Sequence, residues 1–325
     1  MAEFVFRTRP TIRPVALVLC LLFLAGCATI PKTAPTQFAN FSTVTDKLSD
    51  DAIKVYDYTY SLQQATKVEQ FIQSTDTKLS AISYELTYVN PNNLAFRKLL
   101  FNTLKTYAQS LKYIMSNEID TTLDSEITTL SKKLSTLQTT LLPKVTLPSG
   151  ITQATVSQAA TKISDWLIAE RKLKITAKSL ETVTPAILKF VDIVKAEIGT
   201  CGITTDTSQY CVADGYTKDS NSIANTEICT SFQALIRANK ETLTAQSKPG
   251  EIQNIHKIMI NYRLKRDKAC GMIAAFNAAL DGYAKVVSSL PNAMTSKDTQ
   301  QLSENIILVT QQLTGVESLL QLSTL

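Results

Sequence analysis

This chain has a single histidine, His256, and few glycines or prolines: nine and ten in 325 residues. A Ser-His-Asp or Cys-His arrangement would have to use that one histidine, and a transition-metal site would lack its usual imidazole ligands. Gly150, Gly199 and Gly250 are isolated turn formers, so the chain has no glycine-rich phosphate loop. We therefore expect a protein that is not an enzyme, with no catalytic residues, no metal site and no cofactor.

Charge is also scarce, because charged residues make up only 19% of the chain. Residues 1–26 hold three arginines and one glutamate, so the remaining 299 residues carry a net charge of +3. The densest basic group, at Arg263, Lys265, Arg266 and Lys268, has Asp267 among it and is interpreted as a solvated helix surface. A nearly neutral chain without a basic block is a poor ligand for nucleic acid. We predict no nucleic-acid partner.

Paired acids are the one feature that hydrolysis would use. Two of them, Glu118 and Asp120, are followed closely by Asp124 and Glu126, and carboxylate pairs can cleave glycosidic bonds. These acids stand at a predicted helix start, however, where carboxylates are favoured by the helix dipole. A hydrolase acting on the cell envelope is therefore the least favoured alternative, and His256 is interpreted as a solvated helix residue.

Apolar residues recur every three or four positions along most of the chain, which is the period of an amphipathic helix. Long helices are predicted near residues 44–88, 220–246, 251–288 and 297–322, with shorter ones between them. Thr184-Pro185 is expected to open one of the shorter helices, since proline favours the first helical position. No run alternates with a period of two for long enough to predict a sheet. The prediction is an all-α bundle of about seven to eight long helices with antiparallel hairpins.

Two apolar patterns on these helices have both a core and a partner-binding interpretation. Leucine and isoleucine alternate by three and four through Ile127, Leu130, Leu134 and Leu137, which favours an internal seam over a zipper for a partner. Tyr56, Tyr58 and Tyr60 could form an exposed docking surface or stack against a glycan, because tyrosine combines large area with a polar tip. The alternative is that these rings line a seam of the bundle.

The N-terminal segment has the composition of an export signal. Arg7, Arg9 and Arg13 precede an apolar run over 15–24, which is about half of what a bilayer-spanning helix requires. The run ends in Leu24-Ala25-Gly26-Cys27, which resembles the lipobox of bacterial lipoproteins. The resemblance implies cleavage before Cys27, a diacylglyceryl thioether on its sulfur and acylation of its new amino group. Several acyl chains hold a protein stably on a bilayer.

Further expectations follow from that resemblance. Ala28, where an aspartate would mark retention at the inner membrane, implies the outer membrane, with the chain facing the periplasm and surface exposure left open. We divide the chain into a signal peptide (1–26), the lipidated cysteine with an extended tether (27–40) and a helical bundle (41–325), in which Pro143 and Pro148-Ser149-Gly150 leave a sub-division near 143–150 open.

Four cysteines remain after lipidation, and an even number in an exported chain predicts disulfides. If 220–246 and 251–288 form an antiparallel hairpin about Pro249, residues whose numbers sum to about 499 face each other. Cys229 and Cys270 satisfy this, as do Leu235 and Leu264. We therefore predict a Cys229–Cys270 bridge, with Cys201–Cys211 closing a loop.

These features together favour a non-catalytic lipoprotein that binds another envelope protein or serves a structural role in the envelope. The other alternative is a carrier of a small ligand in an apolar cavity between helices. The first requires an exposed docking face, and the second requires an enclosed apolar space.

Overall fold

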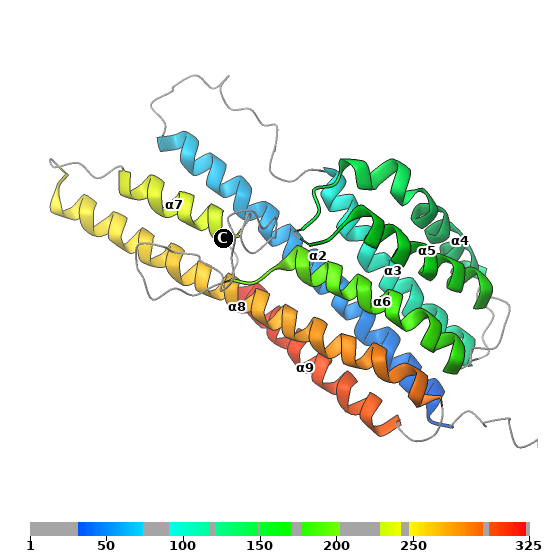
Figure 1. The fold of residues 1–325 in the computed structure, drawn as a ribbon. Helices are drawn as coiled ribbons and strands as arrows, with labels where there is room; N and C mark the ends of the chain where they lie inside the picture. The colour runs from blue at the N-terminus through cyan, green and yellow to red at the C-terminus, as the bar shows by residue number, and fades with distance from the viewer. Residues whose placement is uncertain are drawn as a thin grey trace, which may run out of the picture.

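The computed structural model describes residues 32–73, 91–116, 121–148, 150–170, 177–201, 228–241, 247–294 and 299–322. These residues contain helices and no strand, which confirms the all-α class. The α-helices, labelled in Figure 1, are α2 (Ala34–Gln73), α3 (Pro91–Ser116), α4 (Thr121–Thr136), α5 (Gln153–Glu170), α6 (Ala177–Ile198), α7 (Thr230–Glu241), α8 (Pro249–Ala293) and α9 (Thr299–Leu322). A π-helical turn (Leu137–Leu141) and a 3-10 turn (Leu142–Lys144) follow α4.

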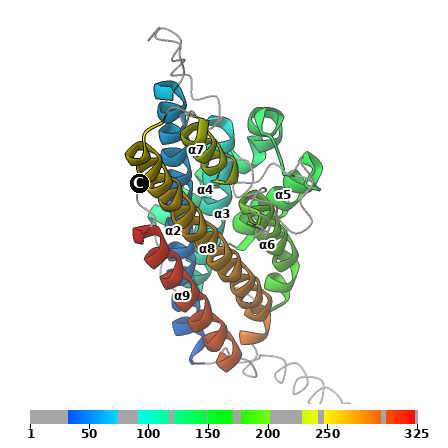
Figure 2. The same cartoon turned by 90° about the vertical axis from the view of Figure 1, so that its left-hand side faces the viewer.

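The two longest helices, α2 and α8, organise the bundle. Helix α9 packs along both of them, α3 packs along α2, and α6 packs against α8. Helices α4 and α5 pack on each other and cover α3 and α6 from outside (Figures 1 and 2). At one end of the molecule, the last part of α2, α7 and the first part of α8 extend beyond the other helices (Figure 1).

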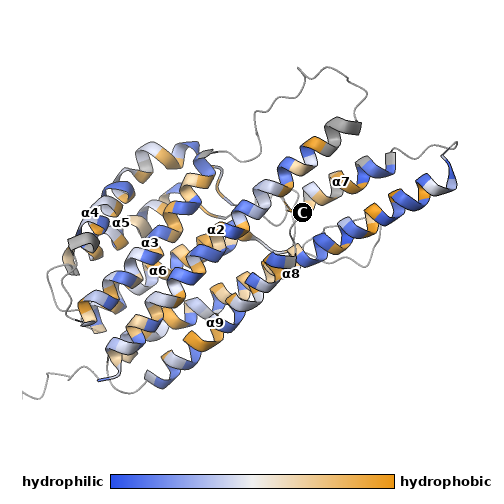
Figure 3. Ribbon diagram, turned by 180° about the vertical axis from the view of Figure 1, so that it is seen from behind, coloured by the Kyte–Doolittle hydropathy of each residue, from blue (hydrophilic) through white to orange (hydrophobic). Residues whose placement is uncertain are grey.

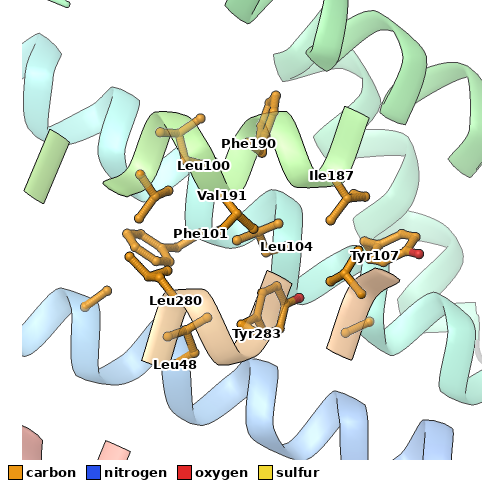
Figure 4. Packing of buried hydrophobic residues seen from close by; sticks show 14 of the residues in the cluster. Leu48, Leu100, Phe101, Leu104, Tyr107, Ile187, Phe190, Val191, Leu280 and Tyr283 are labelled. Atoms are coloured by element: carbon orange, nitrogen blue, oxygen red, sulfur yellow. The ribbon is translucent and has the colours of Figure 1, made fainter. Parts of the chain in front are cut away.

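The central core lies where α2, α3, α6 and α8 meet (Figure 4). Leu48 of α2, Leu104 of α3 and Phe190 of α6 are fully buried there. Phe41 of α2 stacks on Tyr283 of α8 with ring centroids 5.6 Å apart, and Thr45 donates a hydrogen bond to the Tyr283 hydroxyl over 3.2 Å. This bond partly satisfies a polar group inside an otherwise apolar contact.

Helix α2 begins earlier than the sequence predicts. An extended tether was expected over 27–40, but the helix starts at Ala34 and buries both Ala34 and Phe38 completely. Pro35 is tolerated because the first turn of a helix needs no partner for its backbone N–H. The predicted tether is therefore wrong over 34–40. The predicted far end of the same helix, 74–88, lies outside the described residues.

Helix α6 also differs from the prediction, which started a helix at Thr184-Pro185. The helix begins at Ala177 and passes through Pro185. An internal proline costs roughly 3 kcal/mol, yet apolar residues on both sides of it, such as Val183 and Ile187, are buried. Burying one such side chain gains about 1.5–3 kcal/mol, so the continuous buried face offsets the cost of the proline.

Helix α3 begins at Pro91, and α8 continues through Pro291 to Ala293, beyond the predicted helix over 251–288. One further prediction is confirmed. The regular stripe on α4 is buried from Ile127 to Leu137, so it is an internal seam rather than an exposed zipper.

Candidate interaction surface

Helix α8 changes its environment halfway along its length. None of its residues from Pro249 to Lys268 is buried, whereas Ala269 begins a regularly buried face that continues to Ala293. We call residues 249–268, together with α7 and the end of α2 that packs on α7, the tip. The tip projects from the rest of the bundle, which we call the body (Figure 1).

The inner side of the tip continues the hydrophobic core of the body. Phe232 and Leu235 of α7 and Leu62 of α2 are buried, and α7 contacts both α2 and α8. The tip end of α8 is closed by a capping box, in which Glu251 accepts a hydrogen bond from the Lys248 backbone N–H over 2.9 Å. This hydrogen bond gives a backbone N–H at the start of the helix a partner, so the helix can begin at the exposed end of the molecule.

The outer side of α8 exposes a row of aliphatic residues. Ile252, Ile260 and Leu264 have exposed fractions of 45%, 43% and 55%, and the exposed His256 occupies the remaining position of this four-residue spacing. Residues four apart are neighbours on a helix surface, but each such step turns the side chain by about 40°, so Ile260 and Leu264 share a face whereas Ile252 and Leu264 point about 120° apart. We call these four residues the outer row. Figure 3 shows hydrophobic positions recurring along α8 as far as the tip. Single exposed aliphatic residues are ordinary, but a contiguous row on a projecting helix is typical of a contact surface.

The tip is also the basic part of the protein. Residues 251–268 hold five lysines and arginines against Glu251 and Asp267, a net charge of +3. The whole chain after residue 26 also has a net charge of +3. Outside 251–268, its lysines and arginines therefore equal its aspartates and glutamates in number. Arg266 donates a hydrogen bond to Asp267 over 2.9 Å, while Lys257 is exposed beside the outer row.

A disulfide lies at the junction of tip and body. Cys201, three residues beyond the end of α6, is bonded to Cys270, the residue next to Ala269. Gly199 ends α6 with φ of +71°, a left-handed conformation that glycine adopts without strain, and its carbonyl accepts a hydrogen bond from Asn277 over 2.6 Å. The chain leaving α6 is thus fastened to α8 at two points, two turns apart.

This disulfide contradicts both predicted pairings. Cys270 is bonded to Cys201 and not to Cys229, and Cys201 cannot also be bonded to Cys211, which lies outside the described residues. The predicted proximity was nearly right, because the sulfurs of Cys201, Cys229 and Cys270 lie within 4.8 Å of one another. The prediction failed because it did not foresee that α6 packs on α8. The end of α6 lies at the same height along α8 as Cys270, which brings Cys201 to that residue.

The second predicted contact, between Leu235 and Leu264, is also wrong. Leu235 is buried, but Leu264 is the most exposed of the three aliphatic residues in the outer row. A constant sum of residue numbers fixes the height along two antiparallel helices and not the direction of a side chain. Six positions along a helix turn a side chain by about 600°, so Leu264 faces roughly 120° away from Cys270.

The tyrosines for which both a docking surface and a seam of the bundle were considered lie mostly in the core, as the seam interpretation expects. Tyr56 and Tyr58 are 4% and 9% exposed, and Tyr56 packs edge-on against Phe101 with ring centroids 6.0 Å apart. Burial raises the pKa of Tyr58 to about 12. The exposed-surface interpretation is wrong for these two residues. Tyr60, on the same helix, is partly exposed.

The candidate catalytic groups are dispersed. His256 is exposed on α8, as predicted, and Asp124 lies in the first turn of α4, where an acid is favoured by the helix dipole. Glu126 is exposed on the same helix. Glu118 and Asp120 lie outside the described residues, as does the predicted lipidation site Cys27.

A groove of about 320 Å³ lies between α3 and α4. Its lining is Leu99, Asn102, Lys105, Thr106, Gln109, Ser125, Glu126, Thr129, Leu130 and Lys133. Lys105 lies 3.6 Å from Asp46 and so is already balanced by a carboxylate. The lining is mostly polar, so this groove is not the apolar cavity that a carrier of hydrophobic ligands requires.

Sequence reasoning missed the outer row. The available signal was the number of apolar residues in the first half of α8, where Ile255, Ile258 and Met259 are half-buried while the aliphatic residues of the outer row are exposed. No helix in the described part of the chain is long and apolar enough to cross a membrane. No known family model, curated protein or solved structure matches this chain.

Proposed function

We propose that this protein is a lipid-anchored, non-catalytic component of a bacterial outer membrane that faces the periplasm and binds another envelope protein through the outer row of its tip. The observation that carries the proposal is the exposure of Ile252, Ile260 and Leu264 on a helix that projects from the body. The resemblance of Leu24-Ala25-Gly26-Cys27 to a lipobox supports the anchor.

The orientation of the bundle supports the same function. Six residues separate Cys27 from Ala34, the start of α2. Helix α2 begins at the end of the molecule opposite the tip (Figure 1). At 1.5 Å per residue, the helix from Ala34 to Val68 spans about 50 Å. A chain acylated at Cys27 would therefore present the tip away from the bilayer, where it can reach another protein.

The rigid connection of tip and body suits a binding role. The Cys201–Cys270 disulfide and the Asn277–Gly199 hydrogen bond hold α8 at the point where it leaves the body. The packing of α7 on α8 is what an antiparallel hairpin about Pro249 would give. A surface that is fixed before binding loses less conformational entropy on association.

Site-specific photo-crosslinking in intact cells tests this function. A photoreactive residue at position 260 is expected to give one discrete adduct with an envelope protein. The same residue at Thr161, which is exposed on α5 of the body, is the matched control and is expected to give none. Equal crosslinking from both positions, or none from either, would contradict the proposal.

A further inference from the structure

We infer that the groove between α3 and α4 binds a short free peptide, extended along the helices, with its terminal amine at Glu126 and its terminal carboxylate at Lys133. This would be a second binding site, on the body, and it depends neither on the outer row nor on the anchor. The inference follows from the length of the groove and from which of its charged groups have a partner.

The groove is elongated along the two helices. Its lining extends from Leu99 to Gln109 on α3 and from Ser125 to Lys133 on α4. At 1.5 Å per residue, these spans are about 15 Å and about 12 Å. Leu99 and Leu130, which are buried, are the apolar part of the lining, and its other residues are polar or charged. The groove therefore suits a narrow, extended and mostly polar ligand.

The charged residues in the lining differ in whether they have a partner. The ammonium of Lys105 lies 3.6 Å from the carboxylate of Asp46, which also accepts a hydrogen bond from Gln109 over 3.4 Å. The side chains of Glu126 and Lys133 have neither an ion pair nor a hydrogen bond within the part of the chain that the structure describes. Both are exposed. The groove thus offers a ligand one negative and one positive group.

The spacing of Glu126 and Lys133 sets the distance between the charges of the ligand. They are seven positions apart on α4. Seven positions advance by about 10 Å along a helix and return the side chain to within about 20° of the same direction. Both residues therefore lie on one face of α4, the face that lines the groove. A ligand that contacts both must carry opposite charges about 10 Å apart.

A free peptide of about three residues meets this requirement. Each residue of an extended chain advances by about 3.3 Å, so three residues hold the two terminal charges about 10 Å apart. In a single amino acid only one Cα atom separates the amine from the carboxylate, so it cannot reach both groups. Asn102, Ser125 and Thr129 of the lining offer hydrogen bonds to the peptide N–H and C=O groups between the two ends.

Isothermal titration calorimetry of the full-length protein with trialanine tests the inference. We expect trialanine to bind with a dissociation constant in the millimolar range or below. N-acetyl-trialanine has no amine and trialanine amide has no carboxylate. Each should bind about tenfold more weakly than trialanine, because each loses a charge-assisted hydrogen bond to the groove.

Charge-removing variants assign each end of the peptide to its residue. Glu126→Gln should weaken the binding of trialanine about tenfold and leave that of N-acetyl-trialanine unchanged, because a pairwise interaction is lost only once. Lys133→Gln should behave in the same way towards trialanine amide. Lys132→Gln changes an exposed neighbour outside the lining and is the matched control, which should bind all three peptides as the wild type does. Circular dichroism melting checks that the variants are folded.

The results that overturn the inference are separate from those that bear on the tip. Trialanine that does not bind at millimolar concentration overturns it. Binding that neither Glu126→Gln nor Lys133→Gln weakens overturns it as well, because the peptide then lies elsewhere on the protein. Equal weakening by Lys132→Gln shows an unspecific effect of charge and has the same consequence. The proposed function is judged by crosslinking from position 260, which does not involve this groove.

Discussion

The Nε atom of Arg97 on α3 donates a hydrogen bond to Oε2 of Glu197 on α6 over 2.8 Å, with side-chain exposures of only 6% and 2%. The Arg97 guanidinium also lies over the ring of Tyr56 on α2, 5.2 Å from its centroid. The ion pair therefore joins α3 to α6, and the contact of Arg97 with Tyr56 adds α2. Charges taken out of water are tolerated only when each has its partner, so the two residues depend on each other.

Removing one partner of this pair is expected to be severe. Glu197→Ala leaves the Arg97 charge buried without its carboxylate, and we expect the free energy of unfolding to fall by about 3–5 kcal/mol. Urea unfolding followed by circular dichroism measures the change. The double variant Arg97→Met with Glu197→Leu removes both charges and should recover most of the loss. A single variant as stable as the wild type would contradict the burial of this pair.

Gly282 of α8 and Gly315 of α9 should respond in opposite directions to alanine. A Cβ atom at Gly282 would lie 2.7 Å from Cγ2 of Val309, whereas a Cβ at Gly315 meets nothing within 4 Å. Gly282→Ala should therefore destabilise the protein by about 1–3 kcal/mol through overpacking. Gly315→Ala should stabilise it by roughly 0.5–1 kcal/mol, because alanine favours the helix. Thermal unfolding of the two variants checks the contrast, and equal shifts would contradict the close approach of α8 and α9.

The Cys201–Cys270 bridge should contribute substantially to stability. It closes a separation of 69 residues, for which the chain-entropy estimate is about 4 kcal/mol. The double variant Cys201→Ser with Cys270→Ser should lose about that amount in urea unfolding while keeping its helix content. Peptide mapping without reduction is the direct check. A peptide that joins Cys229 to Cys270, or Cys201 to Cys211, would contradict the connectivity.

Asp51 should make stability depend on pH in an unusual direction. Its carboxylate is fully buried, between Lys47 at 3.5 Å and Lys54 at 3.0 Å. Burial raises the pKa of Asp51 above its ordinary 3.8, although both lysines lower it. The folded state therefore binds this proton more tightly than the unfolded chain. Ionised Asp51 accordingly costs stability as pH rises through the shifted pKa.

The Asp51→Asn variant isolates this contribution. The variant should become more stable relative to the wild type as pH rises from about 4 to about 7, so its free energy of unfolding should increase relative to that of the wild type, because only the wild type carries the buried charge. Urea midpoints at a series of pH values give the slope. Glu317, whose pKa is lowered by its hydrogen bond to Lys47, supplies the control of opposite sign in Glu317→Gln. A constant difference between Asp51→Asn and the wild type would refute the assignment.

Much of the fold could be predicted from the sequence, because helix periodicity is local information. The buried stripe from Ile127 to Leu137 and the start of α3 at Pro91 follow from residue spacing and backbone chemistry. Helix ends were less predictable. Pro35 and Pro185 are both compatible with a break, and only the burial of their neighbours in the assembled core decides that the helices continue.

The candidate surface depended on information that a local pattern does not contain. The sequence places Cys229 and Cys270 at one level but does not bring the end of α6 to the same point, so the cysteine pairing could not be deduced. Leu264 is apolar and was expected to be packed, but it faces away from α7 and α2. Which of several apolar faces of a helix meets solvent is decided by the helices that surround it.

The most direct test of the central claim is the mass of the N-terminal peptide from protein extracted from bacterial membranes. We predict a peptide that begins at Cys27 and carries a diacylglyceryl thioether and an acylated amino group. An unmodified Cys27, or a mature chain with an N-terminus elsewhere, would contradict the anchor and the orientation of the tip inferred from it.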